Sequence, residues 1–316
     1  MLYKILLLPA RLFLHFYCKK IVINDKSMLY MRGPLIIAAN HPNSFLDAII
    51  MATLFRHPVH SLARGDAFAG KKITKILTTL NMLPVYRISE GAENLEHNYS
   101  TFEACQNLFK KGEIVLIFSE GQCINEWHLR PLKKGTARLA LTAWQQNIPL
   151  SILPLGINYS SFRKFGKILH LNFGNIITKK DIRADLSSSV AVIEFNKHLQ
   201  QQLKNLVFEI DKNDHEKLQK YFYFDQSFLK KSLLFLPAML GYIFHFPLYY
   251  TIHFIIKDKA VDHYDSIMTG LLFFIYPLYV LALTMLIFFV TGYIISLLLI
   301  LLLPATALCL LHFKRT

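Results

Sequence analysis

Cysteine is scarce in this sequence, and no two cysteines have the spacing of a metal or disulfide motif. The 316 residues contain four, with no CxxC or CxxxC pair among them: Cys18, Cys105, Cys123 and Cys309. Zinc sites and disulfide frameworks use close or regular cysteine spacings. We therefore expect free thiols in a reducing compartment, and no metal or redox cofactor.

Glycine patterns for nucleotide binding and serine hydrolysis are missing as well. No pair of glycines has the spacing that begins a GxGxxG turn, and none has the spacing of a GxSxG elbow. The segment from Gly65 to Lys72 resembles a Walker loop, but Lys72 replaces the Ser or Thr that binds magnesium. Dinucleotide-dependent, serine-hydrolase and nucleotide-hydrolysing functions are therefore disfavoured.

Acidic residues are few relative to basic ones, and the excess lies before residue 232. The chain has 35 Lys and Arg against 21 Asp and Glu, and residues 1–231 hold 31 of the basic and 18 of the acidic groups. Such a charge fits anionic lipid surfaces or phosphorylated substrates as readily as nucleic acid. Because no nucleic-acid-binding module is recognisable, we expect no nucleic-acid partner.

Charged residues almost disappear from the C-terminal part. Residues 232–256 and 267–312 contain no Asp, Glu, Lys or Arg, and about 20 apolar residues suffice for one membrane-spanning helix. The second run is long enough for a hairpin turning near Thr291–Gly292. Basic residues flank the region on both sides, which favours a cytoplasmic location for both ends and an even number of crossings. The sequence predicts a membrane region over residues 232–316 with two or three hydrophobic helices.

Apolar strand-like runs alternate with helical patterns before this region, which indicates an α/β domain over residues 21–231, with a sheet flanked by helices. The expected strands are Pro34–Ala39, Val59–Ala63, Gly112–Phe118, Leu150–Asn158 and Ile168–Phe173. The expected helices are Ser44–Leu54, Lys71–Leu80, Ala92–Lys110, Thr136–Gln146 and Ser188–Val207. Residues 1–20 are apolar but interrupted by basic residues, which favours an amphipathic helix in the membrane interface over an ordinary packing helix.

The segment Asn40-His-Pro-Asn-Ser-Phe-Leu-Asp47 follows an apolar strand and opens a helix. A carboxylate beside a histidine fixes the imidazole tautomer and stabilises the imidazolium, which is what a general base requires. The loop allows His41 and Asp47 to meet. The same residues also fit a simpler interpretation, in which Asp47 caps the helix and His41 bonds to a neighbouring backbone group.

Two further segments carry polar residues where open α/β sheets bind ligands. A buried strand ends at Ser119-Glu120-Gly121, and the basic residues Lys133, Lys134 and Arg138 follow around the start of the next helix. Helix N-terminal amides together with Lys and Arg form a phosphate site. A turn carboxylate and a solvated basic face are the alternatives. Arg87 ends the segment Leu83-Pro-Val-Tyr-Arg and indicates nothing by itself.

Taken together, these segments resemble the four blocks of the glycerolipid acyltransferase superfamily of lysophosphatidic acid and glycerol-3-phosphate acyltransferases, with a PlsC-like domain. NHPNSFLD resembles its catalytic His and Asp block, LPVYR its block with the phosphate-binding Arg, and FSEG its FPEG block. The segment Ile152-Leu-Pro-Leu-Gly-Ile157 is similar to the fourth block. The resemblance extends to about Phe173 and does not cover the C-terminal helices.

The resemblance implies a membrane-bound enzyme of phospholipid synthesis that acylates 1-acylglycerol 3-phosphate to phosphatidic acid. His41, held by Asp47, would deprotonate the acceptor hydroxyl, which attacks the thioester of acyl-CoA or acyl-ACP. Arg87, with Lys133, Lys134 or Arg138, would hold the acceptor phosphate, and Glu120 and Gly121 would order its glycerol end. The expected partners are membrane lipid, the glycerol-phosphate acceptor and acyl-CoA or acyl carrier protein, with the domain on the cytoplasmic face.

Two departures from the family pattern concern the acceptor more than the reaction. Five residues separate His41 from Asp47 where four are commonest, a spacing more like the glycerol-3-phosphate and dihydroxyacetone-phosphate acyltransferases, and Ser119 replaces the usual proline. Those two acceptors and aminolipids such as lyso-ornithine lipids therefore remain alternatives. A catalytically silent lipid-binding adaptor is a rival of another class, and the acyl-chain length, the thioester carrier and the oligomeric state stay open.

Overall fold

The computed structural model describes residues 2–86, 97–183, 185–224, 227–258 and 261–314. The chain forms two compact units. The first comprises residues 1–11, 22–158 and 170–212, and the second comprises residues 12–21, 159–169 and 213–316. Each unit is therefore built from segments that are far apart in the sequence.

Seven strands form one sheet. In chain order they are β1 (Cys18–Ile23), β2 (Leu35–Ala39), β3 (Val59–Arg64), β4 (Met82–Val85), β5 (Ile114–Phe118), β6 (Ser151–Tyr159) and β7 (Lys167–Phe173). Their order across the sheet is β1-β7-β6-β2-β5-β3-β4. The pairs β2–β5, β2–β6, β3–β5 and β3–β4 are parallel. This parallel centre carries the carboxyl ends of β2 and β5 to one edge.

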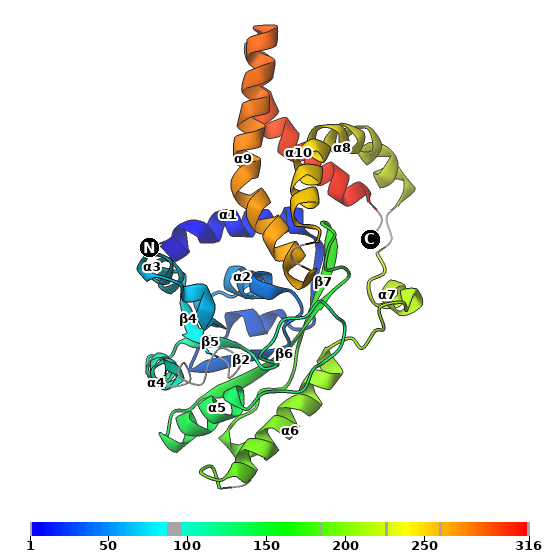
Figure 1. The fold of residues 1–316 in the computed structure, drawn as a ribbon. Coiled ribbons are helices and arrows are strands. Elements are labelled where there is room, and N and C mark those ends of the chain that lie inside the picture. Colours follow the sequence, from blue (N-terminus) through cyan, green and yellow to red (C-terminus); the bar gives the residue numbers. More distant parts are fainter. Residues whose placement is uncertain (1, 87–96, 184, 225–226, 259–260, 315–316) are drawn as a thin grey trace. The chain divides into compact units, whose positions relative to one another are not determined.

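Helices and short 3-10 turns connect these strands (Figure 1). The helices are α1 (Leu2–Tyr17), α2 (Ser44–Leu54), α3 (Lys71–Thr79), α4 (His97–Lys110), α5 (Gly135–Gln145), α6 (Ser189–Leu206) and α7 (His215–Tyr221). The 3-10 turns are Lys26–Tyr30, Gly65–Phe68 and Lys179–Asp181. Together with three long C-terminal helices, these elements confirm the expected α/β class, in which a sheet flanked by helices precedes helices of membrane-spanning length.

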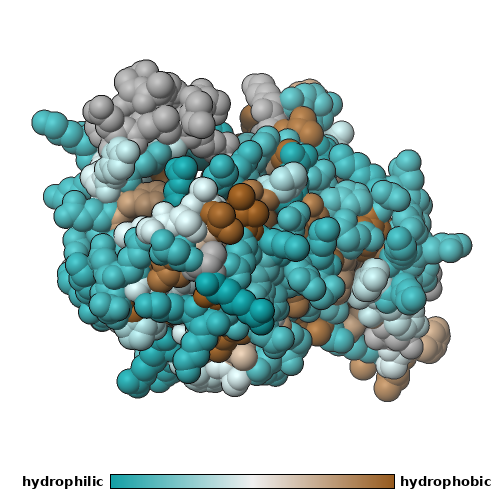
Figure 2. Space-filling model, turned by 90° about the horizontal axis from the view of Figure 1, so that it is seen from below, coloured by the Kyte–Doolittle hydropathy of each residue, from teal (hydrophilic) through white to brown (hydrophobic). Residues whose placement is uncertain are grey.

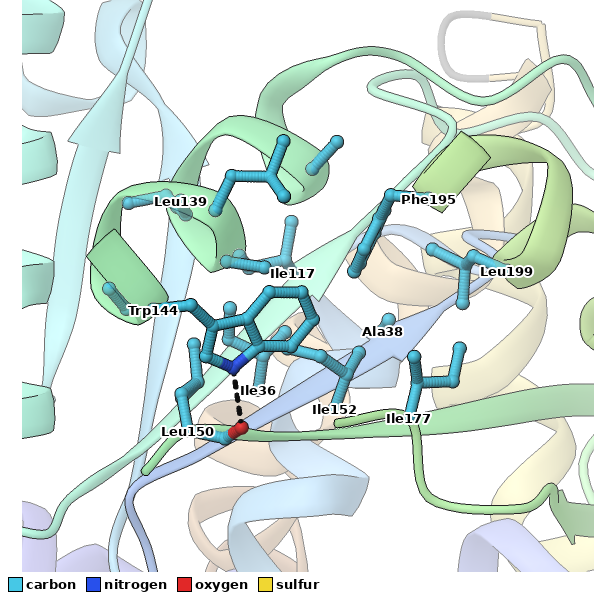
Figure 3. Close-up of a cluster of buried hydrophobic side chains, with 14 of the residues drawn as sticks. Ile36, Ala38, Ile117, Leu139, Trp144, Leu150, Ile152, Ile177, Phe195 and Leu199 are labelled. Atoms are coloured by element: carbon cyan, nitrogen blue, oxygen red, sulfur yellow. Dashed lines mark hydrogen bonds between the residues drawn. The ribbon is translucent and has the colours of Figure 1, made fainter. Parts of the chain in front are cut away.

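The central strand β2 is buried on both faces, which explains its unbroken apolar run. Ile36 and Ala38 belong to a cluster that joins the sheet to α4, α5 and α6 (Figure 3). Side chains alternate along a strand, so Leu35 and Ile37 point to the opposite face, on which α2 lies in Figure 1. Trp144 fills the centre of the cluster, and its indole N–H donates to the Leu150 carbonyl oxygen at 2.8 Å.

The two strands that the sequence did not predict lie at the edges of the sheet. Strand β4 is short and contains Pro84, which an edge strand tolerates because one side of its backbone has no partner. Strand β1 carries Lys19 and Lys20 at the other edge. Helix α1 consequently ends at Tyr17, three residues before the expected end of the N-terminal helix.

Polar residues cover most of the face to which α5 and α6 belong. Figure 2 shows this face from below, with hydrophilic residues over most of the surface and small, scattered apolar patches. Soluble proteins have surfaces of this kind. We infer that this face of the first unit is exposed to water.

The C-terminal part of the second unit contains the three long apolar helices α8 (Phe228–Ile256), α9 (Tyr264–Thr291) and α10 (Leu299–Phe313), with 3-10 turns at Val261–His263 and Ile294–Leu298. Each region is long and apolar enough to cross a membrane. Large apolar side chains are exposed along all three, among them Phe228, Phe274, Phe289, Val290 and Leu301. This surface indicates membrane association.

Helices α9 and α10 are separated by a turn at the expected place. Helix α9 ends at Thr291, and Gly292 follows in the left-handed region with φ +68°. Glycine is the usual residue at this position after a helix because a Cβ atom strains the left-handed backbone. The long charge-free run thus forms two helices, as its length predicted.

Helix α8 is arched, as Figure 1 shows. A straight helix of 29 residues measures about 43 Å, but both ends of α8 return to the neighbourhood of the α10 C-terminus. Phe235 stacks 5.9 Å from Phe313 near one end, and Tyr249 packs 6.3 Å from Phe165 near the other. The residue after Phe165, Gly166, lies against Leu311. Prolines at 237 and 247 lie inside the helix and account for the bends.

Gly156 offers a test of how closely α6 packs on β6. A Cβ atom at position 156 would lie 2.3 Å from the Leu206 carbonyl oxygen, which accepts hydrogen bonds from Asn158 and Asn172. We expect Gly156→Ala to lower the free energy of unfolding by about 1–3 kcal/mol, because neither backbone can yield freely. Thermal unfolding in detergent measures the effect. Gly135→Ala is the matched control, since its added methyl meets nothing within 4 Å; equal destabilisation by both changes would contradict the packing argument.

Candidate active site

Two polar loops meet at the carboxyl edge of the parallel strands. Ala39 of β2 is in register with Phe118 of β5, so the residues that follow each strand emerge side by side. The N–H of Ser119 donates to the Ala39 carbonyl oxygen at 2.9 Å and continues the pairing beyond the strand. This is the edge at which open α/β sheets bind ligands, and it places His41 next to Glu120.

His41 and Asp47 lie together, as the candidate pair requires. Nδ1 of His41 is 2.9 Å from Oδ2 of Asp47, and because a carboxylate only accepts, Nδ1 carries the proton. Asp47 is fully buried, whereas 16% of the His41 side chain is exposed. No hydrogen-bond partner of His41 Nε2 occurs among the residues that the structure describes. This nitrogen is therefore left to accept a proton from a bound hydroxyl.

The start of α2 holds Asp47 in place. The backbone N–H of Asn43 donates to Oδ2 of Asp47 at 2.8 Å, so the carboxylate accepts from both the loop and the histidine. Ser44 begins the helix with φ +51°, and its N–H donates to Sγ of Cys123 at 2.9 Å. The structure therefore agrees with both interpretations of Asp47 from the sequence. The carboxylate accepts a hydrogen bond at the start of the helix, and it also contacts the His41 ring.

Glu120 connects the two loops through both of its carboxylate oxygens. Oε2 accepts the N–H of His41 and Oε1 accepts the N–H of Arg130, each at 2.8 Å. Burial raises the pKa of Glu120 to about 7, although these two hydrogen bonds and the Arg130 charge act in the opposite direction. Glu120 therefore positions the His41 backbone; its predicted contact with an acceptor stays a prediction.

Two site residues were not identified from the sequence. The Phe118 ring stacks on the His41 imidazole with centroids 3.8 Å apart and planes 7° apart. Asn40 forms a pair of hydrogen bonds with the backbone of Ile157, at 3.0 and 2.7 Å. Their positions at strand ends are a weak signal, because an apolar strand end and an Asn in a loop are both common. They restrict the ring plane and the course of the loop.

Gly121 and Lys133 also lie together beside Glu120. Gly121 has φ +65°, and a Cβ atom there would lie 3.0 Å from Cγ of Lys133. The N–H of Lys133 donates to the Ser119 carbonyl oxygen at 2.8 Å. The stem of this exposed lysine therefore crosses the glycine, which brings a cation to the turn that carries Glu120.

The other predicted cations are less closely tied to this turn. Lys134 immediately precedes α5 and Arg138 lies in its first turn, both exposed. The α5 start is fixed to the turn by Thr136, whose hydroxyl is 3.0 Å from that of Ser119. Arg87 lies outside the described residues, so its predicted phosphate contact stays a prediction. Among the described residues, no group of three or more His, Cys, Asp or Glu could hold a metal ion.

Comparisons with known proteins find similarity to acyltransferases. Residues 20–158 match the model of the family described as Acyltransferase. A 1-acyl-sn-glycerol-3-phosphate acyltransferase of Bacillus subtilis (strain 168) is 26% identical over 190 residues, or 60% of this chain and 89% of that protein. The crystal structure of the 1-acyl-sn-glycerophosphate acyltransferase PlsC of Thermotoga maritima aligns with TM-score 0.43 and 16% identity, covering 60% of this chain and 71% of that one. The family model and the Bacillus subtilis relative confirm the resemblance of residues 20–158 to an acyltransferase domain, and they support an acyltransferase enzyme.

The raised pKa of Glu120 predicts a pH-dependent stability. Between pH 4.5 and about 7 the folded protein holds a proton on Glu120 that the unfolded chain releases, so raising the pH through this window lowers stability. Relative to Glu120→Gln, the wild-type free energy of unfolding should fall by on the order of 3 kcal/mol.

Thermal and denaturant unfolding of both proteins in detergent from pH 5 to 8 measures this difference. Glu103→Gln, which removes an exposed carboxylate, is the control. A wild-type protein that gains stability over Glu120→Gln as the pH rises would show that the two N–H donors outweigh burial and keep Glu120 ionised.

Proposed function

We propose that this acyltransferase moves a fatty acyl group from acyl-CoA or acyl-ACP to the free hydroxyl of 1-acylglycerol 3-phosphate, and so makes phosphatidic acid. The observation that carries the proposal is the His41–Asp47 pair at the carboxyl edge of the sheet, with Nδ1 committed to the carboxylate. The Bacillus subtilis relative, a 1-acyl-sn-glycerol-3-phosphate acyltransferase, supports the choice of acceptor.

In the proposed reaction, Nε2 of His41 takes the proton of the acceptor hydroxyl as its oxygen attacks the thioester carbonyl. A new C–O ester bond forms, the C–S bond breaks, and the imidazolium returns its proton to the leaving thiolate. Asp47 stabilises the imidazolium between these steps. The stacked Phe118 ring limits rotation of the imidazole, so the base is oriented before substrate binds. No covalent enzyme intermediate is needed.

The acceptor phosphate would bind the basic residues beside the Glu120 turn. Lys133 is the best placed, because its stem lies over Gly121 and its ammonium group extends from the loop that Glu120 joins to His41. Lys134 and Arg138 add positive charge at the N-terminus of α5, where helix amides also favour an anion. We keep Arg87 in this role as a proposal from the sequence.

Glycerol 3-phosphate and dihydroxyacetone phosphate form the second candidate class of acceptors. The five residues between His41 and Asp47 favour these acceptors. The proposed phosphate site also favours them, because exposed lysines can bind a phosphate whether or not the acceptor carries an acyl chain. Both classes share the proposed base and phosphate contacts. The acceptor's own apolar chain is what distinguishes them.

Acyl transfer by the detergent-solubilised protein tests both the reaction and the acceptor. One labelled acyl-CoA, and then acyl-ACP, is offered with 1-acylglycerol 3-phosphate, glycerol 3-phosphate or dihydroxyacetone phosphate. We expect phosphatidic acid from the first acceptor, and a loss of about 100- to 10,000-fold in kcat for His41→Ala.

The matched control is His60→Ala. His60 lies near the beginning of β3, with Nε2 3.8 Å from the Glu113 carboxylate, and so resembles the catalytic pair at the opposite edge of the parallel strands. The His60→Ala substitution should leave kcat unchanged. Product from glycerol 3-phosphate alone would reassign the acceptor, and full activity of His41→Ala would refute the mechanism.

We further propose that the α/β domain faces the cytoplasm and that α9 and α10 cross the membrane while the arched α8 does not. Both ends of α8 return to the α10 C-terminus, so its two ends belong on one side of the membrane. Two crossings also leave Lys230, Lys231 and Lys314 on the same side, in agreement with the positive-inside rule.

Cysteine labelling in sealed vesicles with the cytoplasmic face outward tests this topology. Cysteines replace Lys197 in the α/β domain, Lys257 after α8, or Thr291 at the end of α9, and the unsubstituted protein gives the background. An impermeant maleimide should label Lys197→Cys and Lys257→Cys, and should reach Thr291→Cys only after permeabilisation. Labelling of Thr291→Cys together with protection of Lys257→Cys would instead indicate three crossings, if Lys197→Cys is labelled.

A further inference from the structure

Lysines gather where α8 begins and α10 ends. The two helices pack antiparallel, because Phe235 meets Phe313 and Gly241 lies against Thr306. Their basic ends consequently coincide, and strand β1 adds two more lysines. We call the following residues the lysine cluster: Lys19, Lys20, Lys164, Lys230, Lys231 and Lys314.

Specific contacts hold the cluster together. Nζ of Lys19 donates to the carbonyl oxygen of Lys314 at 2.8 Å, just beyond the last residue of α10. Nζ of Lys19 and of Lys20 lie 5.0 and 5.4 Å from the centre of the Phe224 ring. All of these residues belong to the second unit. The cluster is thus a defined arrangement of cations from four stretches of the chain: β1, the loop before β7, the start of α8 and the end of α10.

The electrostatics of the cluster are unfavourable in the absence of an anion. Burial and the charges of Lys230 and Lys231 lower the pKa of Lys19 to about 8. Partial burial and the charge of Lys164 likewise lower the pKa of Lys314. Over the described ranges, none of the six lysines forms an ion pair with a carboxylate. The cations therefore repel one another, and a bound anion would relieve this repulsion.

Apolar surface adjoins the cluster directly. Phe228 and Leu229, which precede Lys230, are 84% and 69% exposed, and Leu233 one turn further along α8 is 71% exposed. A soluble anion would use only the lysines. A lipid, whose phosphate is joined to apolar chains, would use both surfaces at once, because its chains can lie along α8.

We propose that the lysine cluster binds the phosphate of an anionic membrane lipid, whose acyl chains lie against the exposed apolar side chains at the start of α8. A phosphate monoester carries up to about two negative charges near pH 7, and a diester carries one. The cluster should therefore prefer phosphatidic acid to phosphatidylglycerol and should not retain phosphatidylcholine. The site is remote in sequence from His41 and Glu120 and does not depend on the proposed reaction.

Lipid titration of the full-length protein in neutral detergent tests the proposal. Short-chain phosphatidic acid, phosphatidylglycerol, phosphatidylcholine and inorganic phosphate are titrated separately, with calorimetry as the readout. The test variant is Lys20→Gln/Lys230→Gln/Lys231→Gln, which keeps the Lys19 hydrogen bond. Its Kd for phosphatidic acid should be about 100-fold weaker than that of the wild type.

A control of equal charge removes three exposed lysines of the first unit, Lys179→Gln/Lys180→Gln/Lys197→Gln. It should bind phosphatidic acid like the wild type. Equal weakening in both triple variants would overturn the site in favour of a general charge effect. Binding of inorganic phosphate as tightly as phosphatidic acid would overturn the lipid assignment.

Folding of the variants is checked by melting in neutral detergent. Removing like charges should leave the melting temperature of the triple variant unchanged or higher. If the triple variant does not fold, Lys20→Gln/Lys230→Gln changes only two exposed side chains and should still weaken binding at least tenfold. Wild-type affinity in that double variant would contradict the proposal.

Discussion

The two hydrogen bonds accepted by Glu120 are the constraint on which the candidate site depends. They tie the loop after β2, the loop after β5 and the backbone at Arg130 to one buried carboxylate. A carboxylate in such a place is costly to bury, and a backbone N–H left without a partner there is costly as well, so each group requires the other. The position of the His41 ring follows from this arrangement, because Asp47 and Phe118 act on a residue whose backbone is already fixed.

The second unit depends on a comparable buried pair. Lys167 and Asp265 form a fully buried ion pair, and the Tyr17 hydroxyl lies 3.1 Å from Nζ of Lys167 and 2.5 Å from Oδ2 of Asp265. Breaking such a pair from one side leaves an uncompensated charge, so the three residues must stay together. This explains why short segments around Tyr17 and Lys167 group with the C-terminal helices. Asp265 lies in the first turn of α9, so the pair fixes the start of this helix.

Periodicity was sufficient to predict the central elements, because strands buried on both faces and amphipathic helices leave clear patterns. It did not reveal the edge strands β1 and β4. The lysines of β1 and the proline of β4 break the apolar pattern, and an edge strand tolerates them because one side of its backbone has no neighbouring strand. The approach of His41 to Asp47 followed from local chain geometry. The hydrogen bond from the His41 backbone to Glu120 depends on the register of β2 against β5, which cannot be predicted from the local sequence. The path of α8 was equally hidden, since its two prolines do not specify the direction of a bend.

The two departures from the family pattern leave the contact between His41 and Asp47 in place. The five-residue segment between His41 and Asp47 contains Ser44, which has a positive φ and donates its N–H to Cys123, and the two side chains meet at 2.9 Å. Ser119 in place of proline supplies an N–H that bonds to Ala39, which a proline lacks. Both changes therefore preserve the proton-accepting geometry.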